Sequence, residues 1–229
     1  MPKEFSLPNL VGDLHYIVFS TYVHEWLFGV CPPRPGLAVL EPGCGSGKFA
    51  LSYALKGGDV NLFDIDEEVV RYARRLKSAL EVLADNHLDA HIWQGDIFAF
   101  EENWGVYDLV FNEGVPQHWP DEGVPQHWPD EKRQGCIDRM ARWAKPGGLV
   151  VIVGNNGHNP QEQETDRAFK FTYEGMPPTR RCFTREELET RMAWAGLKDV
   201  QVAPLGVPDL QHLPVRWTAA TLLGAYGRK

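Results

Sequence analysis

The segment Val39-Leu40-Glu41-Pro42-Gly43-Cys44-Gly45-Ser46-Gly47-Lys48 decides the fold. It continues a short apolar run that begins at Leu37, and a helical pattern follows from about Gly47 to Leu55. The segment therefore predicts a strand, a glycine-rich turn and a helix. Glycines allow the sharp turn and let a ligand lie against the backbone with no Cβ in the way. The start of the helix offers free N–H groups to a polar or anionic ligand group.

The glycine spacing separates three kinds of nucleotide site. A phosphate-binding P-loop requires G-x-x-x-x-G-K-[ST], but Pro42 stands five residues before Gly47, and Phe49 stands where Ser or Thr should be. A dinucleotide fingerprint, G-x-G-x-x-G, would need its third glycine at Lys48. The pattern that remains is E-x-G-x-G-x-G, with the acid Glu41 at the end of the strand.

Strands and helices alternate along most of the chain, which is typical of a parallel sheet with helices on both faces. Two segments fall outside this alternation. Residues 1–36 precede the first strand and include the aromatic, amphipathic stretch Tyr16–Phe28. Residues 155–182 are polar, and long irregular segments of this kind often form lids. The predicted strands are Leu37–Leu40, Val60–Phe63, Ala90–Trp93, Tyr107–Phe111, Leu149–Val153, Val200–Val202 and Thr218–Leu223. The predicted helices after the first cover Val69–Leu83, Asp130–Ala144 and Thr184–Ala195.

Five motifs stand in order along the chain: Glu41–Gly47, Phe63–Asp66, Gln94–Ile97, Tyr107–Glu113 and Lys145–Leu149. In this order they resemble the class I S-adenosylmethionine-dependent methyltransferases, and the stretch from Thr184 to Lys229 resembles that family's last helix and closing strand pair. The resemblance implies an α/β fold, a Rossmann-like three-layer sandwich. Its mostly parallel seven-stranded sheet would have an antiparallel last strand. We expect residues 1–36 to form an N-terminal helical cap, residues 37–229 the cofactor-binding methyltransferase domain, and residues 155–182 a lid insertion within it.

The resemblance also implies the cofactor, S-adenosylmethionine, and the residues that bind it. Asp64 would bind the ribose hydroxyls, a task that suits a carboxylate because it accepts two hydrogen bonds at once. Asp96 would accept from the adenine amino group, and the end of the fourth strand would lie beside the methionine moiety and the acceptor. Asp66 is the better candidate for capping the following helix. The predicted cofactor-binding residues are Glu41, Gly43, Cys44, Gly45, Gly47, Asp64, Ile65, Asp96, Ile97, Asn112 and Glu113.

A nine-residue sequence, EGVPQHWPD, occurs twice in succession, at Glu113–Asp121 and Glu122–Asp130. Either copy alone would connect the fourth strand to the next helix, so we expect the other to be looped out. His118 is the candidate general base, because many members of the resembled family place a histidine there, and His127 is its duplicate. Histidine suits proton exchange near neutral pH, but a base is needed only if the acceptor must lose a proton.

Absences narrow the choice of acceptor. The residues Asn112-Glu113-Gly114-Val115 lack the Asn- or Asp-Pro-Pro-aromatic motif of enzymes that methylate amino groups in nucleic acids. A net charge of −8 also disfavours binding to a polynucleotide. We therefore expect a small-molecule acceptor. The alternatives are a macromolecular (protein or RNA) methyltransferase, a cofactor-binding module without turnover and, with unsuitable glycine spacing, a nicotinamide-dependent oxidoreductase. His24, and His158 with Asn155 and Asn156, are weaker candidates for lining the acceptor pocket.

Length and composition bound the remaining possibilities. The 229 residues, of which 43% are hydrophobic, suit one α/β domain. The four cysteines (Cys31, Cys44, Cys136 and Cys182) are too far apart for zinc spacing, which predicts reduced thiols and no metal. The longest aliphatic run, Leu149–Val153, is too short to cross a bilayer. The start of the chain has no signal pattern. These features predict a cytoplasmic monomer or homodimer without a membrane or nucleic-acid partner.

Overall fold

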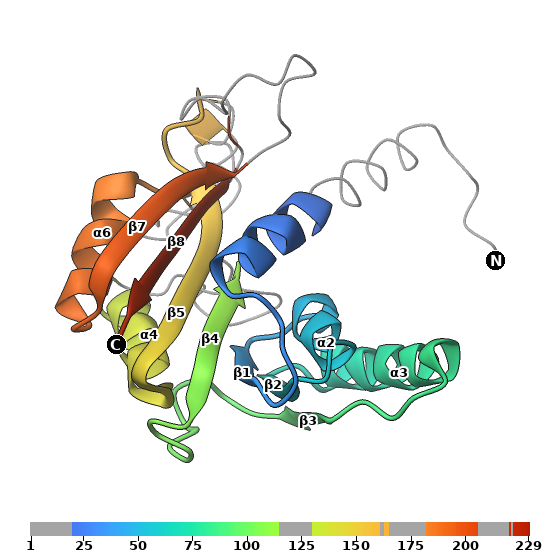
Figure 1. Cartoon of the computed structure of the whole chain (residues 1–229). Helices are drawn as coiled ribbons and strands as arrows, with labels where there is room; N and C mark the ends of the chain where they lie inside the picture. The colour runs from blue at the N-terminus through green and yellow to red at the C-terminus, as the bar shows by residue number, and fades with distance from the viewer. Residues whose placement is uncertain (1–19, 115–129, 161–162, 165–181, 206–219, 221) are drawn as a thin grey trace.

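The computed structural model describes residues 20–114, 130–160, 163–164, 182–205, 220 and 222–229 (Figure 1). Its strands form one sheet with the order β3-β2-β1-β4-β5-β8-β7, and the two-residue β6 pairs with β5 off this path. The strands are β1 (Ala38–Pro42), β2 (Asp59–Asp64), β3 (Ala90–Gln94), β4 (Tyr107–Glu113), β5 (Ala144–Asn156), β6 (Cys182–Phe183), β7 (Lys198–Leu205) and β8 (Leu222–Arg228).

Strand β1 is the point from which the sheet grows in two directions. It pairs in parallel with β2 on one side and with β4 on the other. Such reversal points, at the carboxyl ends of the strands, are where open α/β sheets bind ligands. Strand β8 runs antiparallel to both β5 and β7, so the predicted antiparallel last strand is confirmed.

Helices cover both faces of the sheet, which confirms the predicted three layers. The helix over residues 20–30, α2 (Lys48–Ala54) and α3 (Glu67–Ala84) pack on one face, and α4 (Asp130–Trp143) and α6 (Arg185–Trp194) pack on the other (Figure 1). Side chains of a strand alternate between the faces. Val151 accordingly joins the first core and Val150 the second. Strand β5 is thus buried on both sides, as its apolar sequence predicts.

The helix over residues 20–30 belongs to the same hydrophobic core as α2. Val23 and Leu27 are buried in that core. The Tyr53 hydroxyl donates a hydrogen bond of 2.8 Å to the Cys31 carbonyl oxygen, which ties the end of this helix to α2. The division of the chain into a cap over 1–36, a domain over 37–229 and a lid over 155–182 stays a prediction. Residues 1–19, 161–162 and 165–181 of those segments lie outside the described part of the chain.

The last strand was placed too early by the sequence pattern. We predicted Thr218–Leu223, whereas β8 runs from Leu222 to Arg228. Glycines usually weaken a strand, so Gly224 and Gly227 are not expected within one. In the structure they permit close packing, because a Cβ at Gly224 would lie 2.6 Å from the Trp26 ring.

Two further boundaries differ from the prediction. Strand β5 is longer than the predicted Leu149–Val153, because it begins directly after α4 and continues to Asn156. Helix α3 begins two residues before the predicted Val69–Leu83 and ends one residue after it, and Leu83 in its last turn is 82% exposed. At about 1.5 Å per residue, α3 is about 27 Å long, whereas the neighbouring five-residue β3 spans about 17 Å. The last turn of α3 therefore has no sheet to pack on. Within the described part of the chain, the helices are too short or too polar to span a membrane.

Candidate functional site

The glycine-rich turn joins β1 to α2 at the carboxyl edge of the sheet. Gly43, Gly45 and Gly47 all have positive φ, at 65°, 52° and 70°. At Gly47 a Cβ would lie 2.6 Å from Leu62 Cδ1, so this glycine is needed for packing between the turn and β2. At Gly45 a Cβ would meet nothing within 4 Å. Gly47 is thus tightly packed, whereas Gly45 faces open space.

Asp64, the last residue of β2, is held beside this turn by the backbone. Its Oδ2 accepts a hydrogen bond of 3.0 Å from the Gly45 N–H, and its Oδ1 accepts one of 3.1 Å from the Asp66 N–H. A carboxylate offers about four acceptor positions, so both oxygens keep the capacity to accept from a ligand. Asp66 instead caps α3 by accepting from the Glu68 N–H at 2.8 Å, as predicted.

Cys44 and Ile65, two predicted cofactor contacts, differ in exposure. The Cys44 N–H donates to the Phe63 carbonyl oxygen at 3.0 Å, which fastens the turn to the end of β2. Its side chain is buried, and this burial raises the pKa of the thiol far above its usual value. Ile65 is 46% exposed beside Asp64. Ile65 is therefore open to a ligand, whereas the Cys44 side chain packs inside the turn.

Glu41 is a buried carboxyl beneath the turn, with an exposed fraction of 2%. Its Oε2 accepts a hydrogen bond of 3.1 Å from the Ala50 N–H in the first turn of α2. Burial raises its pKa well above the usual value, and the charges of Glu113 and Asp64 add to this effect. The Ala50 hydrogen bond and the charge of Lys48 act in the opposite direction. Glu41 therefore packs on the buried side of the turn, where burial favours the protonated carboxyl group.

Glu41→Gln is expected to flatten the dependence of stability on pH. The folded chain retains a proton on Glu41 that the unfolded chain releases above its own pKa, about 4.3. Stability from this group is therefore fully present below that pH and is lost as pH rises through the folded pKa. Glutamine stays neutral and keeps an acceptor for the Ala50 N–H. Urea unfolding from pH 4 to 9 should show the variant gaining on the wild type as pH rises.

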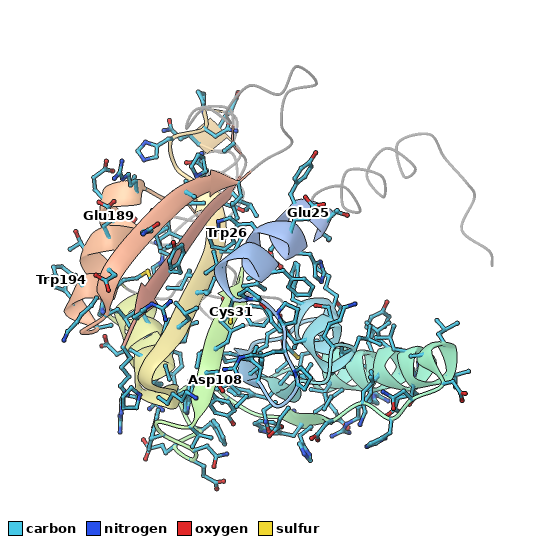
Figure 2. All side chains as sticks on the ribbon, viewed as in Figure 1. Glu25, Trp26, Cys31, Asp108, Glu189 and Trp194 are labelled. Atoms are coloured by element: carbon cyan, nitrogen blue, oxygen red, sulfur yellow. The ribbon has the colours of Figure 1, made fainter. Side chains whose placement is uncertain are left out.

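The matched control is Glu25→Gln, which removes a carboxylate from an exposed position on the helix over residues 20–30 (Figure 2). Its stability should follow the wild-type pH curve. Parallel curves for Glu41→Gln and the wild type would contradict the assignment of a proton to Glu41.

The end of β4 contributes Asn112 and Glu113 to the same edge. The buried Asn112 amide Nδ2 donates to the Pro42 carbonyl oxygen at 2.5 Å, so this residue braces the glycine turn from β4. Burial raises the pKa of Glu113, and the charge of Lys48, whose Nζ lies 3.9 Å from Glu113 Oε2, opposes that shift. An acid and a base thus stand together beside the turn.

Asp96 and Ile97 follow β3, as predicted. Asp96 Oδ1 accepts from the Phe98 N–H at 2.8 Å, and its backbone carbonyl accepts from the Phe100 N–H at 2.9 Å. Asp96 therefore organises the turn after β3, and Ile97 is buried against the core next to it. The neighbouring Gly95 N–H donates to the Asp64 carbonyl oxygen at 2.9 Å, which keeps the turn after β3 close to the end of β2.

His24 is a polar side chain that the helix over residues 20–30 brings to α2. Its ring centroid lies 4.5 Å from that of Phe49, whose ring also carries Lys48 Nζ at 4.6 Å from the centroid. His24 Nδ1 lies 2.9 Å from the Ser20 carbonyl oxygen. A carbonyl only accepts, so Nδ1 carries the proton and Nε2 keeps the lone pair of the neutral ring.

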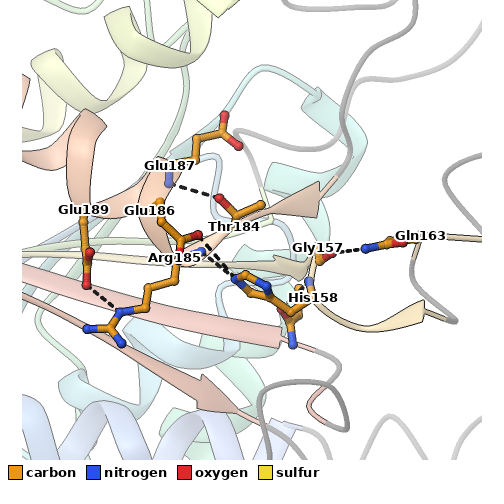
Figure 3. A network of polar contacts seen from close by, with 9 residues as sticks. Gly157, His158, Gln163, Thr184, Arg185, Glu186, Glu187 and Glu189 are labelled. Atoms are coloured by element: carbon orange, nitrogen blue, oxygen red, sulfur yellow. Dashed lines mark hydrogen bonds and ion pairs between the residues drawn. The ribbon is translucent and has the colours of Figure 1, made fainter.

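His158 has a structural role in the part of the chain that is described. Its backbone N–H donates to Asn156 Oδ1 at 2.9 Å. Its Nε2 accepts from the Arg185 N–H at 3.1 Å (Figure 3). It thereby satisfies the first turn of α6, while Thr184 Oγ1 caps the same helix by accepting from the Glu187 N–H at 3.1 Å. Asn156 Nδ2 donates to the Ala220 carbonyl oxygen at 2.8 Å. These contacts assign His158 and Asn156 to connections within the fold.

The predicted base lies beyond what the structure describes. His118 and His127 are outside the described residues, as is most of the repeat; only Glu113, Gly114 and Asp130 of it are placed. Among the described residues, Asp59, Asp89 and His91 bring potential metal-ligand atoms within 4.8 Å of one another. They stand at the starts of β2 and β3, away from the glycine turn, and take no part in the site.

The sheet order, the glycine turn and Asp64 together define a Rossmann-like nucleotide-binding protein. Over residues 33–190 the chain matches the family described as "Methyltransferase domain", so it belongs to that family. The prediction of a class I S-adenosylmethionine-dependent methyltransferase is thereby confirmed, together with S-adenosylmethionine as the cofactor of the class.

Relatives agree with this membership. The chain is 33% identical over 124 residues to a ubiquinone biosynthesis O-methyltransferase of Pectobacterium atrosepticum, covering 51% of this chain and 42% of the relative. It is 26% identical over 129 residues to a malonyl-[acyl-carrier protein] O-methyltransferase of the same organism, covering 56% and 43%. The chain thus spans less than half the length of these two relatives. Magnesium protoporphyrin IX methyltransferase from Synechocystis PCC 6803, solved with bound SAH, shares the fold at a TM-score of 0.64 and 20% identity, covering 100% of this chain and 90% of that one.

Proposed function

We propose that this protein transfers a methyl group from S-adenosylmethionine to an oxygen of a small-molecule acceptor. The observation that carries the proposal is the placement of the Asp64 carboxylate on the Gly45 N–H, beside a turn with open space at Gly45. A carboxylate next to an open glycine backbone suits a nucleoside, whose ribose offers two hydroxyl donors. Membership of the methyltransferase-domain family supports the same ligand.

The predicted contacts divide into those that would touch the cofactor and those that support the turn. Asp64 would bind the ribose hydroxyls, Ile65 would cover the adenosine, and Asp96 would accept from the adenine amino group. Gly43 and Gly45 would let the methionine part lie against the backbone. Glu41, Cys44 and Asn112 would hold the turn in shape. The remaining predicted cofactor-binding residues are Gly47, Ile97 and Glu113.

When bound, S-adenosylmethionine supplies a methyl group already activated on its sulfonium. The chain's own residues then need to align the acceptor with that methyl group and exclude water. Alignment of two reactants can contribute about 7–11 kcal/mol at its upper limit. This requirement suits the rigid carboxyl edge of β1 and β4, where the main-chain hydrogen bonds of the turn are already made.

An oxygen acceptor is supported by the two relatives described above, which are named as O-methyltransferases. We propose that the acceptor lies near His24 and Lys48, which both contact the Phe49 ring, and Glu113, which pairs with Lys48. A hydroxyl or carboxyl group could hydrogen-bond to each of them. His118 stays the predicted base, and among the described residues His24, with its lone pair on Nε2, is the alternative.

The test is methyl transfer from cofactor labelled in the methyl group. The purified protein would be offered small phenols and small carboxylic acids in one set of reactions, and bulk RNA and protein in another. We expect label in the small-molecule fraction, reduced at least tenfold in the variant of whichever histidine is the base, His118→Ala or His24→Ala. Label that appears only in RNA or protein would contradict the small-molecule acceptor.

A second candidate function, a cofactor-binding module without turnover, is favoured by the identical repeat at Glu113–Asp121 and Glu122–Asp130. It predicts that S-adenosylhomocysteine binds while no acceptor is methylated, and that deletion of residues 122–130 restores transfer. Turnover by the intact chain would exclude this alternative.

A further inference from the structure

A small cavity of about 230 Å³ lies at the edge of the sheet where the parallel strands begin. This edge is opposite to the carboxyl edge that carries the glycine turn. The cavity is formed by the loop after the helix over residues 20–30, by the starts of β1 and β4, and by the end of β8. Figure 2 labels two lining residues, Cys31 and Asp108; the others used below are Arg34, Gly147 and Arg228.

The carboxylate of the cavity is already engaged by the chain. Asp108 Oδ1 lies 3.1 Å from Arg34 Nη2 and 2.5 Å from Lys145 Nζ, and Oδ2 accepts from the Ala38 N–H at 3.1 Å. Burial alone would raise the pKa of Asp108, but the Lys145 and Ala38 hydrogen bonds and the two cations hold it below its usual value. Asp108 is therefore a fixed negative charge that organises the cations around it.

The cations exceed that single charge. Arg34 and Lys145 pair with Asp108, and Arg228 lines the same cavity as Arg34 and Asp108, so three cationic side chains accompany one carboxylate here. Arg228 Nη1 donates to the neutral Gly147 carbonyl oxygen at 3.3 Å, and among the described residues no carboxylate forms an ion pair with Arg228. This local excess of positive charge occurs in a chain whose net charge is −8.

The guanidinium groups of Arg34 and Arg228 both affect the Cys31 thiol. The charges of Arg34 and Arg228 both lower the pKa of the Cys31 thiol, whereas burial, the largest effect, and Asp108 raise it, to about 11 overall. The thiol is therefore protonated at neutral pH and is not a nucleophile. The cavity has the features of a binding site and not of a second catalytic centre.

The loop that carries Arg34 is stiff. Its sequence is Cys31-Pro32-Pro33-Arg34-Pro35-Gly36, and the three prolines restrict the backbone on both sides of the arginine. The Arg34 carbonyl oxygen also accepts from the Leu37 N–H at 3.2 Å. A guanidinium on a restricted backbone loses less conformational entropy when it binds a ligand.

We propose that this cavity binds a compact dianion, a phosphate group or a small dicarboxylate, between the guanidinium groups of Arg34 and Arg228. The fork of N–H donors in arginine matches the oxygens of both groups. Three cations and one carboxylate leave two positive charges for the ligand to neutralise. The volume is below the roughly 300–1,000 Å³ of clefts for drug-sized ligands, which restricts the ligand to a small ion or the anionic end of a larger molecule.

The experiment is calorimetric titration of the full chain with inorganic phosphate and, separately, with succinate, at ionic strength held constant with sodium chloride. We expect saturable binding of at least one of the two probes at a single site. Arg228→Gln should weaken it by a factor of about ten or more, since one charge-assisted hydrogen bond contributes about that factor. Binding of phosphate alone would identify the ligand as phosphate-bearing, and binding of succinate alone as a dicarboxylate.

Two controls make the outcome decisive. Arg71→Gln removes the same charge from the exposed surface of α3, where Arg71 pairs with Glu68, and should leave the affinity within a factor of two. Asp64→Ala, at the other edge of the sheet, should also leave dianion binding intact, so the test is independent of the proposed methyl transfer. No saturable heat with either probe, or equal weakening by Arg71→Gln and Arg228→Gln, would overturn the proposal.

Discussion

Asp64→Ala is expected to weaken binding of S-adenosylhomocysteine by a factor of about 100 or more. The proposed ribose contacts are two hydrogen bonds to a charged acceptor, each contributing about 1.5–3 kcal/mol, and about 2.8 kcal/mol corresponds to a factor of 100. The variant also loses the acceptor for the Gly45 N–H, so the turn loses its link to the end of β2. Calorimetric titration of both proteins measures the difference directly.

The neighbouring Asp66 is a matched control. It stands two residues away and caps α3 through the Glu68 N–H. Asp66→Ala should lower the free energy of unfolding by about 1 kcal/mol, the usual contribution of an N-cap, and change the affinity by less than a factor of two. If both variants bound the ligand equally well, Asp64 would be only a turn residue and the proposed cofactor contact would be wrong.

Gly47→Ala is expected to lower the free energy of unfolding by about 2–5 kcal/mol. A residue with a Cβ costs about 1–2 kcal/mol in the left-handed region, and Gly47 has a φ of 70°. The added methyl would also stand 2.6 Å from Leu62 Cδ1, and overpacking of this kind costs about 1–3 kcal/mol. Urea unfolding monitored by circular dichroism measures the loss.

Gly45→Ala should affect ligand affinity more than stability. Its φ of 52° carries a strain of about 1–2 kcal/mol, but its Cβ would meet nothing within 4 Å. The methyl would instead occupy the open space where the cofactor is proposed to lie, and affinity for S-adenosylhomocysteine should fall at least tenfold. A Gly45→Ala protein that binds normally would show that the ligand does not approach this glycine.

The anion-binding cavity and the proposed methyl-transfer site lie at opposite edges of the same strands. Strand β4 places Asp108, its second residue, at the cavity and ends with Asn112 and Glu113 beside the glycine turn. Asp108 thus belongs to the sequence motif that resembles the family's fourth strand but contacts the opposite edge. Of these three residues, only Asn112 and Glu113 are predicted cofactor contacts.

The sequence by itself determined the order of elements and the family. Alternating strand and helix patterns predicted a parallel sheet with helices on both faces, because local periodicity and turn residues are carried by a single sequence. The antiparallel last strand was implied by the family that the five ordered motifs resemble, and not by any local pattern. The helix cap at Asp66 was predictable because the cap accepts from an N–H only two residues away.

Only the tertiary structure showed which polar residues join distant parts of the fold. His158 accepts from the first backbone N–H of α6, Asn112 braces the glycine turn, and Asp108 pairs with cations from two segments, Arg34 and Lys145. Each of these contacts joins residues far apart in the chain, so no local pattern could reveal them. The position of Gly224 inside β8 also depends on a distant contact. Trp26, near the other end of the chain, occupies the space that a side chain at position 224 would need.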